Sequence, residues 1–370
     1  MKYVSIVVWM VLFVCKSYGQ IEVSTFLKGD YKVDDALIFD SKGNLYGSHY
    51  EGSSVYKITP KGVATVFATG FNTPNGLAFD AKGHLHVCDN RGNRIYILDT
   101  SGVFLDTVSI TNPSGIIRKR GSDTMIFTQY EPNRLSYLAP DGSIELIQHN
   151  LPLNGPVGLC YDDNNRLYIG NFTDRKIYRY HRDSFQYIAR IPGPSSGSSW
   201  LGFIIYANGY LWGTSFNGHK VHRVDPEAVD EVLLYAGSGS GYIDGSFEKA
   251  RFTGPNGIVA SRSGDTLFVS EYPSGRIRQI VNRSISVPEL VHELDVYPNP
   301  CSSGSLYVYT KKAMKNAQVK IITANGQVVK NLGKLSGNQF RLETKGLSPG
   351  VYTIVLSSNS HLLRSSLWVL

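Results

Sequence analysis

The sequence contains two similar copies of one motif: TPNGLAFDAKGHLHVCDN at residues 73–90 and GPNGIVASRSGDTLFVSEY at residues 254–272. Each copy begins with Pro-Asn-Gly, continues through an apolar stretch, turns at a glycine, and runs through a second apolar stretch to an acidic residue. Two short strands joined by a tight turn account for this pattern. The motif therefore marks a repeated structural unit, and the number of residues between successive units indicates the fold.

The unit recurs six times. The residue that opens its second strand is apolar and recurs at steps of 40, 40, 42, 44 and 56 residues: Leu45, Leu85, Met125, Leu167, Leu211 and Leu267. A glycine or alanine precedes each of these residues by nine or ten positions, and an aliphatic residue follows ten positions later. Units of about 40 residues made of short antiparallel strands are typical of β-propellers. The sequence predicts an all-β fold with a six-bladed β-propeller at residues 20–286.

The ends of this region predict how the ring closes. The last unit shows three strands before the pattern stops, whereas EVSTFLKG at residues 22–29 resembles a fourth strand such as VATVFATG at residues 63–70. An open ring would leave an unpaired sheet edge. We therefore expect the N-terminal strand to complete the sixth blade.

The flanking segments have different characters. Residues 1–19 combine an early lysine, a short apolar run and small residues before Gln20, which predicts a secretory signal peptide. A lipoprotein signal would use Cys15, but Val14 stands where that signal needs a small residue. After a linker at 287–294, residues 295–370 contain alternating strands with glycine turns, which predicts a small β-sandwich. No transmembrane segment is expected, because no apolar run is long enough.

The net charge of +7 comes from the two ends of the chain. Residues 295–370 carry nine basic and two acidic residues, and residues 20–294 carry 26 basic and 28 acidic residues. A nearly neutral propeller gives no reason to expect a nucleic-acid partner. The three cysteines outside the signal peptide, Cys88, Cys160 and Cys301, are scattered, so we expect free thiols rather than disulfides.

Three motifs in the C-terminal segment resemble the sorting domain of the type IX secretion system: YPNP at 297–300, ANGQVV at 324–329 and GLSPGVYTIVL at 346–356. The resemblance implies that the secretion machinery carries the protein across the outer membrane. The protein is then secreted or held at the cell surface. An ordinary adhesive β-sandwich is the alternative.

The stretch AGSGSGYIDGSFEKARFTGPNG at 236–257 resembles the signature of NHL-repeat propellers. The units, over roughly residues 22–283, resemble the broader superfamily that includes the gluconolactonase (senescence marker protein) family. Members of that family hold a divalent cation with acidic and amide side chains at the starts of the inner strands. The resemblance implies calcium or another divalent cation at Asp35, Asn75 and Asn256, and a metal-dependent lactonase-like activity. The apolar residues at the matching positions of two other units depart from that pattern.

Two sets of repeated positions are polar. The residue before the repeat glycine or alanine is Asp35, Asn75, Ser114, Val157, Leu201 or Asn256. Since blades six and one are neighbours in a closed ring, we expect the polar members of this set to form one arc at a mouth of the channel.

The residue four positions after the start of each second strand is His49, Asp89, Gln129, Asn171, Ser215 or Glu271. His49, Asp89 and Glu271 are candidate catalytic groups. The alternative is that these side chains satisfy strand ends and water in a wet channel.

The next position is aromatic in five units of six: Tyr50, Tyr130, Phe172, Phe216 and Tyr272. We expect these rings, with Gln129 and Asn171, to form a rim for an extracellular ligand such as a glycan, a peptide or a small molecule. Packing between adjacent blades is the alternative. Two functions are thus compatible with the sequence, an exported ligand-binding propeller and a metal-dependent lactonase-like hydrolase acting at the channel mouth.

Overall fold

The computed structural model describes residues 20–149, 152–194, 197–272, 274–283, 294–302, 304–323, 327–358 and 362–370. All regular secondary structure within these ranges is β-strand. The chain divides after residue 284 into two compact units. The expected signal peptide and nearly all of the expected linker lie outside the described residues.

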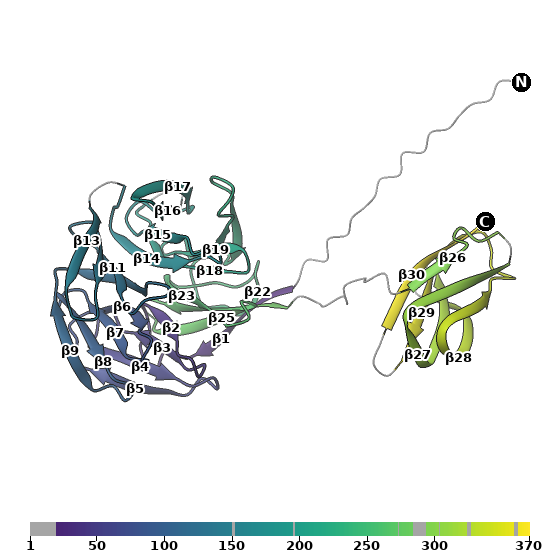
Figure 1. Ribbon diagram of the computed structural model, residues 1–370, viewed down its shortest axis with the longest axis horizontal. Helices are drawn as coiled ribbons and strands as arrows, with labels where there is room; N and C mark the ends of the chain where they lie inside the picture. The colour runs from purple at the N-terminus through teal and green to yellow at the C-terminus, as the bar shows by residue number, and fades with distance from the viewer. Residues whose placement is uncertain are drawn as a thin grey trace, which may run out of the picture. The chain divides into compact units, whose positions relative to one another are not determined.

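The first unit is the expected six-bladed β-propeller (Figure 1). Its first five blades are four-stranded antiparallel sheets in chain order, with the first strand of each blade next to the central channel. Their strands are β2 (Leu37–Phe39), β3 (Leu45–Ser48), β4 (Ser54–Ile58) and β5 (Ala64–Thr69) in blade one; β6 (Pro74–Phe79), β7 (Leu85–Asp89), β8 (Arg94–Leu98) and β9 (Phe104–Ser109) in blade two; β10 (Pro113–Arg118), β11 (Met125–Gln129), β12 (Arg134–Leu138) and β13 (Ile144–His149) in blade three; β14 (Pro156–Tyr161), β15 (Leu167–Asn171), β16 (Lys176–His181) and β17 (Ser184–Arg190) in blade four; and β18 (Leu201–Ala207), β19 (Tyr210–Ser215), β20 (Lys220–Val224) and β21 (Val232–Ala236) in blade five.

The sixth blade is built from both ends of the propeller sequence. It contains β23 (Pro255–Ala260), β24 (Thr266–Glu271), β25 (Arg276–Arg283), β1 (Gln20–Leu27) and the short β22 (Gly245–Ser246). Strand β1 pairs antiparallel with β25, with Val23 opposite Ile280, and both side chains are fully buried. The predicted closure of the ring by the N-terminal strand is confirmed.

The repeat glycines are explained by close packing between neighbouring inner strands. A Cβ atom added to Gly76, Gly115 or Gly257 would collide with a backbone carbonyl oxygen of the next blade. The carbonyls belong to Ser114, Val157 and Asp35, respectively. A side chain larger than hydrogen at these positions would therefore push two blades apart.

Hydroxyl groups join the blades at the same level. Ser48, Thr214 and Ser270 lie in the second strands of blades one, five and six. Each donates a hydrogen bond to a carbonyl of the following blade: Ser48 to Asn75 at 2.8 Å, Thr214 to Asn256 at 2.6 Å, and Ser270 to Asp35 at 2.7 Å. The last of these bonds crosses the seam between blade six and blade one.

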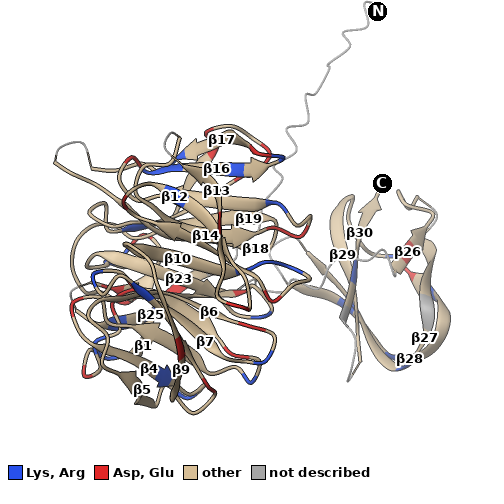
Figure 2. Ribbon diagram, turned by 60° about the vertical axis from the view of Figure 1, so that its left-hand side comes forward, with Lys and Arg blue, Asp and Glu red and all other residues tan. Residues whose placement is uncertain are grey.

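Blade six also contains a buried charge network. Arg278 of β25 is fully buried and forms ion pairs with Glu271, at 3.2 Å, and with Asp244. Its guanidinium also donates to the carbonyls of Arg251 and Ile243 at 2.8 and 2.9 Å. These contacts hold part of residues 236–257, the segment that resembles the NHL signature, against the last blade. Elsewhere, acidic and basic residues are interspersed along the strands and turns of the propeller (Figure 2).

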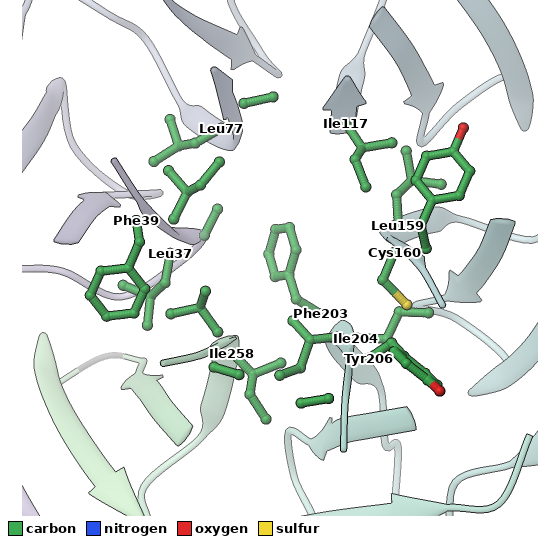
Figure 3. A pocket seen from close by; sticks show the side chains of 18 of the residues that line it. Leu37, Phe39, Leu77, Ile117, Leu159, Cys160, Phe203, Ile204, Tyr206 and Ile258 are labelled. Atoms are coloured by element: carbon green, nitrogen blue, oxygen red, sulfur yellow. The ribbon is translucent and has the colours of Figure 1, made fainter. Parts of the chain in front are cut away.

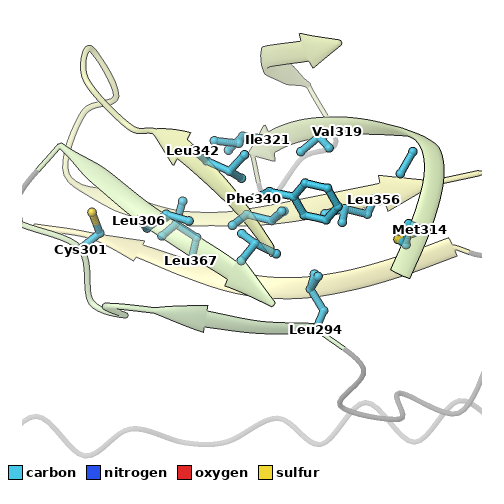
Figure 4. Packing of buried hydrophobic residues seen from close by; sticks show 13 residues of the cluster. Leu294, Cys301, Leu306, Met314, Val319, Ile321, Phe340, Leu342, Leu356 and Leu367 are labelled. Carbon is cyan, nitrogen blue, oxygen red and sulfur yellow. The ribbon is translucent and has the colours of Figure 1, made fainter. Parts of the chain in front are cut away.

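The second unit is the expected β-sandwich. Its strands are β26 (Leu294–Tyr297), β27 (Ser305–Thr323), β28 (Val328–Glu343), β29 (Gly350–Ser357) and β30 (Leu362–Val369). The first part of β27 pairs with β26, and its last part pairs with β29, so the sheet folds over on itself. A single apolar cluster that includes Leu306, Phe340 and Leu356 fills the space between the layers (Figure 4). Cys88, Cys160 and Cys301 are free and buried, as expected.

The closing strand should contribute strongly to stability. Deleting residues 20–27 removes a row of ladder hydrogen bonds and buried side chains, and we expect a loss of at least about 3 kcal/mol in the free energy of unfolding. Val23→Ala should cost roughly 1–2 kcal/mol, because it leaves a cavity at a fully buried position. Denaturant titration measures both variants, with the exposed Lys28→Ala as a control. An unchanged transition midpoint in the deletion would contradict the role of β1.

Candidate functional site

A cavity of about 210 Å³ lies at the end of the channel where the inner strands begin. Two kinds of position line it, one at the start of each inner strand and one immediately after each second strand. The lining residues are Asp35, Tyr50, Glu51, Asn75, Asn90, Ser114, Tyr130, Val157, Phe172, Phe203, Phe216, Asn256 and Tyr272. The structure thus brings together the polar arc and the five aromatic residues that the repeat pattern singled out.

The polar arc extends across the seam. Asn256 of blade six donates its side-chain amide to Asp35 Oδ1 of blade one at 2.8 Å, and to the carbonyl of Asp34 at 3.1 Å. Asp35 Oδ2, Asn75 Oδ1 and Ser114 Oγ are buried and have no hydrogen-bond partner among the described residues. Because buried polar atoms are nearly always hydrogen-bonded, these three atoms around one cavity call for a partner there, either ordered water or a ligand.

Burial controls the charge of this arc. It raises the pKa of Asp35 well above its usual value, and the neighbouring Asp34 raises it further, although the bond from Asn256 opposes the shift. Burial also raises the pKa of Asp34 to about 7. Burial therefore favours the protonated form of Asp35. A protonated carboxyl donates as well as accepts, so the arc offers both kinds of hydrogen bond with little negative charge.

Aromatic rings form the opposite wall. Tyr130, Phe172, Phe216 and Tyr272, from four consecutive blades, contact one another in sequence, with ring centroids 6.0, 6.4 and 5.5 Å apart. Trp200 stacks on Phe172 at 5.7 Å with an interplanar angle of 14° and supports this wall from behind. The four rings are half-buried and line the cavity. The polar arc therefore comes from blades six, one, two and three, whereas blades four and five line the cavity with apolar side chains alone.

The second set of predicted polar residues lies behind the cavity instead of facing it. Five of its members bind backbone groups in the segment that leads into their own inner strand. Asp89 accepts from Asn72 and Thr73, Glu271 accepts from Thr253, Gln129 donates to Thr111, Asn171 to Pro152 and Ser215 to Pro192. None of the six is among the described lining residues of the cavity. Their observed contacts orient the loops that carry the site.

His49 occupies the corresponding position in blade one. Its Nε2 atom lies 3.7 Å from Asp34 Oδ2, and Asp34 Oδ1 accepts from the backbone amide of Tyr50 at 2.8 Å. Burial lowers the pKa of His49 and raises that of Asp34, so burial favours the uncharged form of each. The histidine and this carboxyl thus form a weakly charged pair beside the site.

The structure corrects the expected alignment of blade five. Leu201 pairs with Ser215, in the way that Pro74 pairs with Asp89, and Ile204 pairs with Gly213. In the ladder, Gly202 and Phe203 therefore stand level with Asn75 and Gly76, although a Cβ atom on Gly202 would still collide with the carbonyl of Asn256 in the next blade. The reason is a two-residue turn at Asn208-Gly209, both with positive φ, which shortens this hairpin by one residue. The Asn-Gly pair was the signal in the sequence for the shift.

The donor set suits a divalent cation incompletely. Asp35, Asn75, Ser114 and Asn256 supply oxygen atoms, but one buried carboxyl that favours its proton is the sole acidic group of the arc. Calcium favours several oxygens that include charged carboxylates. No cluster of three histidine, cysteine, aspartate or glutamate residues with metal-binding geometry occurs in the described part of the chain. The residues present do not match a strong cation site, and no catalytic step follows from one.

Comparison with known proteins identifies the C-terminal unit and the propeller fold. Residues 295–369 match the family model of the secretion system C-terminal sorting domain. The protein is therefore exported by type IX secretion to the cell surface or the extracellular space. No curated protein matches the sequence. The described residues include no helix long and apolar enough to cross a membrane.

Solved structures with the same propeller fold have diverse activities. An auxiliary nutrient binding protein from Bacteroides thetaiotaomicron is 16% identical, with a TM-score of 0.60, 70% of this chain covered and 76% of that chain. A gluconolactonase from Xanthomonas campestris is 16% identical, with a TM-score of 0.56 and coverages of 74% and 93%. Virginiamycin B lyase from Staphylococcus aureus is 18% identical, with a TM-score of 0.51 and coverages of 71% and 99%. At these identities the likeness shows the fold alone.

The raised pKa of Asp34 predicts a pH dependence of stability. Between its usual value of 3.8 and the folded value of about 7, the folded state binds a proton that the unfolded state has lost. The stability contributed by Asp34 therefore falls as the pH rises through this window. Asp34→Asn keeps the acceptor for Tyr50 and does not titrate. Its free energy of unfolding relative to the parent should rise by roughly 2–4 kcal/mol from pH 4 to pH 8. Denaturant titrations at both pH values test this, with the exposed Asp106→Asn as control, and a constant difference would contradict it.

Proposed function

We propose that the exported propeller binds a small ligand in the cavity at the beginning of the inner strands. The observation that carries the proposal is the set of three buried oxygen atoms, on Asp35, Asn75 and Ser114, that lack partners in the described structure. They lie on residues that line the cavity, opposite a continuous wall of aromatic rings. A ligand with hydroxyl or amide groups on one side and an apolar face on the other matches both walls.

The chemistry favours an uncharged ligand such as a sugar unit or a polar segment of a peptide. Sugar rings present hydroxyl groups at their edges and C–H groups on their faces, which matches an arc of amide, hydroxyl and protonated carboxyl groups facing aromatic rings. A cavity of about 210 Å³ accommodates a small molecule or the end of a longer one. At its mouth, the exposed Glu51 lies 3.6 Å from Arg91, which balances part of the negative charge at this part of the rim.

In this proposal each wall has a separate role. Asn75 and Ser114 bind polar groups of the ligand, while protonated Asp35 donates a hydrogen bond. The backbone at two of these positions is fixed by the preceding blade, since Ser48 holds the carbonyl of Asn75 and Ser270 holds that of Asp35. The rings of Phe172 and Phe216 contribute the apolar contact. Because the partners are already in place, little ordering is needed when the ligand binds.

An array of monosaccharides, oligosaccharides and short peptides tests the proposal, followed by calorimetry on any hit. We expect Asn75→Ala and Phe172→Ala each to weaken binding at least about tenfold, because each removes a contact from one wall. Phe104→Ala, which changes a partly exposed ring on an outer strand, is the matched control and should leave affinity unchanged. Binding that is insensitive to both cavity variants would place the ligand elsewhere and overturn the proposal.

A metal-dependent lactonase-like hydrolase is the second candidate, favoured by the carboxyl and amide side chains at the starts of the inner strands. Thermal melting with calcium and with a chelator separates the two candidates. A cation site would give calcium-dependent stabilisation that disappears in Asp35→Ala. Because the arc has little negative charge, we expect the melting temperature to shift by less than about one degree. A larger shift that Asp35→Ala abolishes would favour the hydrolase.

A further inference from the structure

A second and larger cavity, of about 690 Å³, occupies the opposite part of the channel (Figure 3). Later residues of the inner strands line it. Phe203 lines both cavities. Its phenyl ring lies at the centre of the circle of side chains that surrounds the channel (Figure 3). The channel is therefore divided at the level of Phe203, with a different compartment on each side. We call the larger compartment the lower cavity.

The wall of the lower cavity is apolar in every blade. The first residue after the close contact between inner strands is aliphatic in all six blades: Leu37, Leu77, Ile116, Leu159, Ile204 and Ile258. Phe39, Phe79 and Ile117 continue the wall toward the opening and are half-buried. Water gains few hydrogen bonds against such a wall, so an apolar ligand would replace it favourably.

The opening of the lower cavity carries an excess of positive charge. Arg118, Arg120 and Arg262 belong to its lining and are exposed, whereas Asp163 is the one acidic residue among the described lining residues. Asp163 already accepts a hydrogen bond from Tyr206 at 3.2 Å. The balance at this opening favours a negatively charged group.

The arginines retain donors for an additional partner. Arg118 contacts Asp123 at 3.9 Å, with both side chains partly exposed, and an exposed pair of this kind is weak. Arg120 lies over the ring of Tyr161, 5.3 Å from its centroid, which fixes the guanidinium near the opening. In the described part of the chain, Arg262 forms no ion pair. Guanidinium groups bind carboxylates through paired hydrogen bonds, so these three residues suit an acidic head group.

We propose that the lower cavity binds a single-chain anionic lipid, namely a fatty acid. The acyl chain occupies the aliphatic channel below Phe203, and the carboxylate lies at the opening among Arg118, Arg120 and Arg262. This site is separate from the cavity at the beginning of the inner strands, so the proposal does not depend on the polar ligand proposed there.

Displacement of a fluorescent polyene fatty acid from the full mature chain tests the proposal. Palmitate should displace the probe in a saturable manner, and hexadecanol, which lacks the charge, should do so at least about tenfold less strongly. Replacing Arg118, Arg120 and Arg262 together by glutamine should weaken palmitate binding about tenfold or more and leave hexadecanol unaffected. Ile117→Asp, which places a carboxylate in the wall, should abolish binding of both.

Controls separate this site from the other cavity and from membrane adsorption. Phe172→Ala changes the opposite compartment and should leave palmitate binding unchanged. Since the three arginines are exposed, their variant should keep the melting temperature of the parent even if Ile117→Asp does not fold. Failure of palmitate to displace the probe, or loss of displacement in Phe172→Ala, would overturn the proposal. Binding to anionic phosphatidylglycerol vesicles without displacement by monomeric palmitate would also overturn it.

Discussion

The propeller depends on the contact between neighbouring inner strands. At Gly76, Gly115 and Gly257 a backbone carbonyl of the next blade occupies the space of a side chain, and at Ser48, Thr214 and Ser270 a hydroxyl group binds a carbonyl of the next blade. The acceptor carbonyls of these three hydroxyls belong to Asn75, Asn256 and Asp35. The contacts that hold the ring together therefore also set the backbone positions of the polar arc. The same residues therefore serve the architecture through their backbone carbonyls and the site through their side chains.

The inner strands divide the channel into two chemical environments. Their first residues place polar side chains around the smaller cavity, and the residues after the glycine contact are aliphatic around the lower cavity. Phe203 lies between them because blade five has a shorter hairpin and so has phenylalanine where most blades have glycine. One irregular blade thus converts a continuous channel into two compartments. The asymmetry of the polar cavity follows from the same region, since blades four and five line it with apolar side chains alone, namely Val157, Phe172, Phe203 and Phe216.

Sequence periodicity predicted the blade number, the closing strand and the gathering of the polar arc, because these depend on spacing that repeats. It could not decide which way the side chains after each second strand point. Asp89 and Glu271 follow apolar strands just as a catalytic carboxylate would, yet both bind backbone amides of adjacent loops. Periodicity also misaligned Leu201 with the polar positions, because a glycine happened to stand nine residues before Leu211 while the true register was shifted by a two-residue turn. The raised pKa of Asp35 depends on its burial within the assembled ring, and no local pattern encodes it.

The composite sixth blade orders the folding of the molecule in time. Val23 pairs with Ile280, so the first strand of the propeller can pair only after the last strand of the propeller has been made, while the other blades form from consecutive segments. Pairings of such long sequence separation are the slow step in folding, since a large loop must close before they gain any stabilisation. Until β25 has emerged, the growing chain is an arc with two unpaired edges. An export route that keeps the chain unfolded until synthesis is complete would spare this arc from premature pairing with other chains.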